Sequence, residues 1–161
     1  MHQERYSMRE VAPDAYKAMG GLQRFVDQSS LSHALLELVK MRASQLNRCA
    51  FCLDMHSKDA IALGVAPEKL FVLDAWREAP FYSEQERAAL AWTEALTLIA
   101  ENDVPDALYD EARRHFSERE LAELTMAIIA INGWNRIAIS TRMQAGRYQS
   151  RLKPEGSAAA S

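Results

Sequence analysis

Two cysteines and a histidine lie close together in this sequence and could carry out thiol chemistry. Cys49 and Cys52 are the only cysteines among the 161 residues, and His56 follows the second after three intervening residues. On a helix, two thiols at this spacing can form a disulfide, and a histidine one turn further can exchange a proton with a thiol. The spacing therefore predicts a redox-active pair.

The two thiols are expected to play different roles. A helical wheel places both cysteines and His56 on one inward stripe, near a helix start whose macrodipole stabilises a thiolate. Cys52 is one turn from His56, whereas Cys49 is seven residues away from it. We therefore predict that Cys52 is the attacking thiolate and that Cys49 is the resolving thiol.

Such a pair can reduce a peroxide without a metal. A thiolate that takes the distal oxygen becomes a sulfenic acid, which a neighbouring thiol converts to a disulfide. His56 can serve as the acid and base, and an acidic residue would orient its ring. Glu37 on the preceding helix is the candidate, because apolar residues on both sides of that helix would turn it inward. An exposed glutamate on a surface helix is the alternative interpretation.

The elements that must hold these side chains are all helical. Apolar residues recur with helical spacing and strand-like alternation is scarce, which predicts an all-α fold of about seven helices. We expect helices over residues 13–25, 33–47, 70–76, 88–100, 105–116 and 121–145, with a motif-bearing helix that ends at Gly64. Ser83 and Ser117 each stand three residues before a glutamate and predict capping boxes. The last helix is apolar on most sides, which predicts burial.

Composition sets the broad class. The length and the 48% hydrophobic content suit one globular domain, which we assign to residues 1–146, with a disordered tail over residues 147–161. The net charge of −3 and the absence of a basic block argue against nucleic acid and membrane partners. Residues 1–10 lack the apolar region of a signal peptide, so a cytoplasmic protein is expected.

Taken together, these residues resemble a known family. Glu37, eleven intervening residues, Cys49-Ala50-Phe51-Cys52, three more residues and His56 resemble the alkylhydroperoxidase D-like (AhpD-like) members of the carboxymuconolactone decarboxylase superfamily. The resemblance is close over residues 35–64, and the helical remainder is compatible with the same fold.

The resemblance implies an all-helical subunit that assembles into trimers or hexamers. It also implies a thiol-dependent peroxidase with a proton relay through Glu37, Cys49, Cys52 and His56, in which the second cysteine is peroxidatic. Some members carry a histidine directly before that cysteine, where this chain has Phe51. A relay through that histidine does not exist here.

Three other functions fit parts of the pattern. Cys49, Cys52, His56 and Glu37 could bind zinc, although structural zinc usually draws on a second ligand pair of similar spacing. A carboxymuconolactone decarboxylase-like lyase would share the fold but would not depend on a Cys-x-x-Cys pair. A thiol-disulfide reductase or redox adaptor would exchange electrons with a protein partner and react little with peroxide.

The electrons are expected to come from outside the chain. No nucleotide-binding glycine motif is present, so the reductant should be a dithiol, such as a thioredoxin-like protein or a lipoyl carrier. No flavin, haem or metal cofactor is expected. The predicted partners are therefore a hydroperoxide, a dithiol reductant and further copies of the chain.

Overall fold

The regular secondary structure is entirely helical. The computed structural model describes residues 3–153, which contain eight α-helices, one 3₁₀ helix and no strand. The α-helices are α1 (Met8–Val11), α2 (Pro13–Asp27), α3 (His33–Leu46), α4 (Ala50–Ala62), α5 (Pro67–Phe71), α6 (Glu84–Thr97), α7 (Asp106–His115) and α8 (Glu118–Thr141), and the 3₁₀ helix η1 spans Leu73–Ala75. The all-α prediction is confirmed, and the short α1 is the helix that the sequence pattern did not indicate.

Both predicted capping boxes are formed. The Ser83 hydroxyl accepts a hydrogen bond from the Glu86 amide, and the Glu86 carboxylate accepts one from the Ser83 amide, which fixes the start of α6. Ser117 and Glu120 do the same at the start of α8. These reciprocal bonds satisfy amides that have no partner within the helix.

The helix ends agree less well with the sequence pattern. Gly64 has a φ of 91°, a conformation that glycine adopts without strain, and it ends α4 as predicted. The last helix stops at Thr141, four residues before the predicted end. Arg142 there is left-handed, with a φ of 61°, and the Met143 amide donates to the Ala138 carbonyl across the turn. A non-glycine residue in this conformation is uncommon, which is why the sequence did not reveal the stop.

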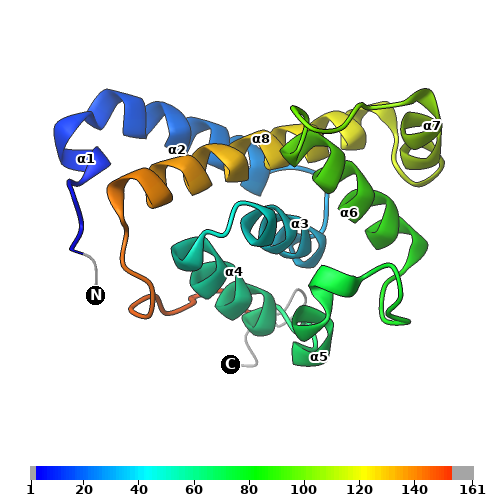
Figure 1. The fold of residues 1–161 in the computed structure, drawn as a ribbon, viewed down its shortest axis with the longest axis horizontal. Coiled ribbons are helices and arrows are strands. Elements are labelled where there is room, and N and C mark those ends of the chain that lie inside the picture. The colour runs from blue at the N-terminus through cyan, green and yellow to red at the C-terminus, as the bar shows by residue number, and fades with distance from the viewer. Residues whose placement is uncertain (1–2, 154–161) are drawn as a thin grey trace, which may run out of the picture.

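Helix α3 lies at the centre of the fold. It contacts α4, α6 and α8, and Figure 1 shows it between α4 and the long α8. Ten consecutive residues, from Leu35 to Ser44, are buried. A helix covered on every side must enclose its polar residues too, and Glu37, Lys40 and Arg42 are therefore turned into protein.

Helix α8 runs along one side of the molecule with α2 beside it (Figure 1). Leu124, Ile128 and Ile131 are fully buried against the neighbouring helices, as the apolar pattern predicted, whereas Ile129 and Ile139 are half-exposed. No helix among residues 3–153 is both long and apolar enough to cross a membrane.

Candidate functional site

The turn between α3 and α4 positions the two cysteines. Arg48 takes a left-handed conformation, with a φ of 57°, and Cys49 is the N-cap residue of α4, where its sulfur accepts a hydrogen bond from the Cys52 amide. Cys49 and Cys52 form a disulfide, with 5.4 Å between their Cα atoms. The motif thus lies at the start of a helix, as predicted, and its two sulfurs can pair without backbone movement.

Side-chain amides hold this turn against α8. The Asn47 amide group donates to Asn132 Oδ1 at 3.0 Å and to Asn135 Oδ1 at 2.8 Å. Asn135 is completely buried and donates in turn to Ser44 Oγ at 3.0 Å. Because a buried amide needs partners, this network explains polar residues on a helix that is otherwise apolar.

The cysteines differ in what they face. Each is 1% exposed, and both pack against Ala43, Ile131 and Ala138. Cys52 lines a pocket of about 520 Å³, whereas Cys49 is not among its lining residues. A small molecule in the pocket would therefore meet the Cys52 sulfur, the thiol to which the sequence assigned the attack.

The pocket combines an apolar wall with ionisable groups. Its apolar side chains include Phe51, Met55, Trp134, Met143 and Leu152, and its ionisable side chains include Glu37, Lys40, His56, Asp59 and Tyr148. Phe51, which stands where some family members have a histidine, contributes only hydrocarbon. Any acid–base chemistry in the pocket must therefore come from its ionisable side chains.

Glu37 is the centre of the ionisable wall. It is 3% exposed, so the interpretation as a surface glutamate is wrong. Its Oε2 lies 2.7 Å from His56 Nδ1, and its Oε1 accepts from Lys40 Nζ at 2.7 Å. Burial raises the pKa of Glu37, but the hydrogen bonds and charges of His56 and Lys40 outweigh burial and hold the pKa below its ordinary value. Glu37 is therefore ionised, and it fixes the imidazole so that Nε2 remains for chemistry.

His56 completes the predicted set. It is buried on α4 one turn after Cys52, and both residues line the same pocket. The structure thus brings Cys49, Cys52, His56 and Glu37 together, from one helix and from the helix packed against it.

Three further residues of this wall were not predicted. Lys40 follows Glu37 by one helical turn, a spacing that suits an ion pair and could have indicated it. Asp59 follows His56 by one turn and accepts hydrogen bonds from the Tyr148 hydroxyl at 2.8 and 3.1 Å. Tyr148 belongs to the segment predicted to be a disordered tail, so no sequence signal indicated it. Residues 154–161 of that segment lie outside the described part of the chain.

Carboxylate and imidazole groups here could also hold a cation. Glu37, His56 and Asp59 each place one ligand atom within 4.8 Å of the others. The Lys40 ammonium on Glu37 opposes a second positive charge at this position. The alternative zinc site considered from the sequence used a different set of ligands, and its two cysteines are bonded to each other here and offer no thiolate.

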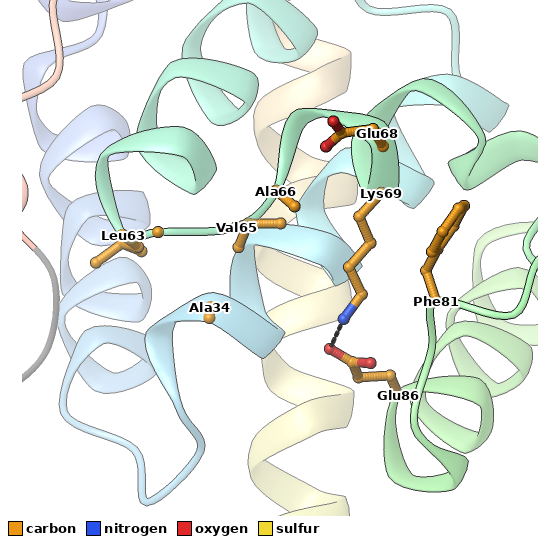
Figure 2. A pocket seen from close by; sticks show the side chains of 9 residues that line it. Ala34, Leu63, Val65, Ala66, Glu68, Lys69, Phe81 and Glu86 are labelled. Atoms are coloured by element: carbon orange, nitrogen blue, oxygen red, sulfur yellow. Dashed lines mark hydrogen bonds and ion pairs between the residues drawn. The ribbon is translucent and has the colours of Figure 1, made fainter.

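A larger hollow of about 680 Å³ lies elsewhere, near the junction of α4 and α5. Figure 2 shows Leu63, Val65 and Ala66 beside an ion pair between Lys69 and Glu86, whose atoms are 2.5 Å apart. Its lining contains no thiol and no imidazole. Size alone would select this hollow, but the reactive groups select the Cys52 pocket.

Comparison with known proteins agrees with this geometry. The model of the carboxymuconolactone decarboxylase family matches residues 12–95. The uncharacterized protein YdfG of Bacillus subtilis (strain 168) is 43% identical over 137 residues, which are 85% of this chain and 93% of YdfG.

Two crystal structures extend the comparison. ATU0492 of Agrobacterium tumefaciens, a protein of unknown function with a suggested role as the antioxidant defence protein AhpD, matches with a TM-score of 0.87 at 42% identity, over 91% of this chain and all of that one. The debrominase Bmp8, in complex with 2,3,4-tribromopyrrole, matches with a TM-score of 0.75 at 26% identity, over 84% of this chain and 73% of Bmp8. The chain therefore belongs to the carboxymuconolactone decarboxylase family, as one of its AhpD-like members.

Proposed function

We propose that this protein is a thiol-dependent peroxidase that reduces hydroperoxides through a Cys49/Cys52 dithiol–disulfide cycle. One observation carries the proposal: Cys52, His56 and Glu37 line a single pocket, while Cys49 lies behind Cys52 in bonding contact with it. The family and the suggested antioxidant role of ATU0492 support it.

In the first step Cys52 is oxidised. His56 takes the Cys52 proton, and the thiolate attacks the distal oxygen of the hydroperoxide, so that the O–O bond breaks as an S–O bond forms. The leaving alkoxide receives the proton from the imidazolium and departs as an alcohol. Glu37 stabilises the charged ring during this transfer, because it is ionised and hydrogen-bonded to Nδ1.

In the second step the sulfenic acid is resolved. The Cys49 sulfur attacks the Cys52 sulfur, a disulfide forms, and the hydroxyl leaves as water with the proton of the Cys49 thiol. The short reach between the two residues makes this step intramolecular and fast. A dithiol reductant, either a thioredoxin-like protein or a lipoyl carrier, then restores both thiols by exchange.

The assembly and the location belong to the same proposal. We place the enzyme in the cytoplasm, and we propose that it forms a homo-oligomer, a trimer or a hexamer, which is the assembly that its resemblance to AhpD-like proteins implies. The half-exposed apolar side chains Phe25, Ile129 and Ile139 on α2 and α8 offer surface for contacts between subunits.

The test counts thiols. Fully reduced, metal-free protein is treated with a small excess of cumene hydroperoxide, and the free thiols and the intact mass are measured. The proposal expects both thiols of the chain to disappear with a mass decrease of about 2 Da, the signature of one disulfide.

The alternatives give different results in the same assay. Thiols that stay reduced would overturn the peroxidase and favour the redox adaptor or the lyase. Because Bmp8 is a debrominase, the rate of dithiol oxidation is also measured with 2,3,4-tribromopyrrole in place of the peroxide. Faster oxidation by the bromopyrrole than by the peroxide would favour debromination. Zinc that copurifies in proportion to protein would indicate the metal site instead.

A further inference from the structure

The chain that follows α8 is tied to the helix that carries Cys52. We call residues 146–152 the C-terminal strap; no helix or strand occurs in them. The Gly146 amide donates to Asp54 Oδ2 at 2.9 Å, Lys58 Nζ donates to the Tyr148 carbonyl at 2.9 Å, and the Tyr148 hydroxyl donates to Asp59 at 2.8 Å. All three partners of the strap belong to α4.

The strap forms part of the wall of the Cys52 pocket. Tyr148 and Leu152 line it together with Cys52 and His56. Both cysteines are 1% exposed, and only Cys52 borders the pocket. A reductant that attacks the disulfide must therefore enter through the space that the strap helps to enclose.

The attachment of the strap is weaker than that of the helices. Hydrogen bonds to three α4 side chains, of Asp54, Lys58 and Asp59, replace the continuous backbone bonding of a helix, and Asp54 and Lys58 are partly exposed. Segments held in this way open at a lower free-energy cost than the packed core. Release of the strap from α4 would break none of the backbone hydrogen bonds within α3, α4 or α8.

Size then separates the possible reductants. In thiol–disulfide exchange the attacking sulfur must reach one sulfur of the disulfide, form a mixed disulfide and expel the other sulfur as a thiolate. A small dithiol fits in a pocket of about 520 Å³. A thiol on a folded protein can reach the disulfide only if the protein surface around that thiol also fits against the pocket.

We infer that Tyr148 is a specificity-determining residue for the reductant: its hydrogen bond to Asp59 keeps the strap on the pocket, which admits small dithiols and excludes protein thiols until the strap is released. The inference rests on the redox cycle of the proposed function, although it does not depend on which oxidant made the disulfide. Each turn consumes one dithiol, which becomes a disulfide, and yields the two protein thiols.

The test measures reduction of the oxidised full-length protein in the absence of peroxide. Rates with dithiothreitol and with reduced thioredoxin are compared for the wild type, Tyr148→Phe and Lys58→Met. Each variant removes one hydrogen bond of the strap, so we expect thioredoxin to react about 3- to 10-fold faster. For Lys58→Met, whose side chain is not among the residues that line the pocket, the dithiothreitol rate is expected to change by less than about twofold, because the path of this small dithiol is already open.

Tyr109→Phe is the matched control. Tyr109 lies on α7 against Trp92, outside the pocket, and its variant should leave both rates unchanged. Equal acceleration with both reductants, or no acceleration with thioredoxin in either strap variant, overturns the inference and leaves the redox cycle intact. A wild-type disulfide that neither reductant opens overturns the redox cycle as well.

Discussion

Two ion clusters involve buried residues of α3, and they resemble each other in charge but not in surroundings. In the pocket cluster, Glu37 is bound by His56 and Lys40 and faces a cavity. In the Arg42 cluster, Glu94 of α6 is bound by Arg42 at 2.8 Å and by Arg77 at 2.6 Å.

The partners of the two carboxylates make the difference. Burial raises the pKa of Glu94, but hydrogen bonds from Trp76, Arg77 and Arg42 outweigh it and hold the pKa below its ordinary value, as happens to Glu37. An indole and two guanidiniums hold their protons at all physiological pH values, whereas an imidazole exchanges its proton. A buried, ionised carboxylate therefore marks a reactive site only when its partner titrates and a cavity admits a substrate.

The largest expected effect is that of replacing Cys52, because only the pocket cluster has a thiol beside it. Cys52→Ser should lower peroxide consumption by at least about 1,000-fold, because no other thiol is among the residues that line the pocket. Cys49→Ser should trap Cys52 as a sulfenic acid, detected by dimedone labelling and mass spectrometry. A sulfenic acid found on Cys49 instead, in the Cys52→Ser protein, would reverse the assigned roles.

The second prediction makes the same substitution, glutamate to glutamine, in each of the two clusters. Glu37→Gln should slow peroxide reduction near neutral pH by about 10- to 100-fold, since an amide cannot stabilise the imidazolium. Glu94→Gln should leave the rate constant for reduction unchanged and lower the free energy of unfolding by about 1–3 kcal/mol, because the buried Arg42 loses one of its two carboxylate partners and the Trp76 indole loses an ionised acceptor. Urea unfolding and stopped-flow oxidation measure the two quantities. If the two variants lost activity equally, the contrast between the clusters would be false.

The third prediction follows from the lowered pKa of Glu94, a property that Glu37 shares. A carboxyl group whose pKa is lower in the folded state stabilises the protein above its unfolded pKa, near 4.5, and this contribution disappears as the pH falls through the folded pKa. The stability deficit of Glu94→Gln relative to wild type should therefore be full at pH 6 and shrink from about pH 4.5 downward. Denaturation series at several pH values test this, and a deficit that is the same at pH 6 and pH 3 would contradict it.

The smallest expected effect lies at the edge of the Arg42 cluster. Arg77 is exposed over 61% of its side chain although it contacts Glu94 and the ring of Trp76. Exposed ion pairs contribute little, so Arg77→Ala should cost less than about 1 kcal/mol and leave activity unchanged. A loss above about 2 kcal/mol would mean that Arg77 is as important to the cluster as the buried Arg42.

Much of the fold could be predicted because its signals are local. Capping boxes at Ser83 and Ser117, the glycine after α4 and the apolar period of α8 each depend on neighbours within a few residues. The end of α8 and the short α1 could not, since Arg142 takes a conformation that its side chain does not favour and Met8–Val11 is only one turn long.

The residues of the candidate site also differ in how far local sequence could predict them. The proximity of Cys49, Cys52 and His56 could be predicted because Cys49 caps α4 and the other two lie on it, where spacing fixes which face they share. Glu37 was a choice between two environments, and the packing of α4, α6 and α8 around α3 decided it. Tyr148 was missed because its partner, Asp59, is 89 residues away in sequence.

The sequence by itself therefore determined the helical class and the proximity of Cys49, Cys52 and His56, since these follow from periodicity and spacing within a turn or two of helix. Tertiary structure alone decided which cysteine lines the pocket, that Glu37 is buried with Lys40 and His56, and that the strap is hydrogen-bonded to α4. The physical reason is that burial and pairing of charges depend on contacts between segments distant in sequence, which only the packed chain brings together.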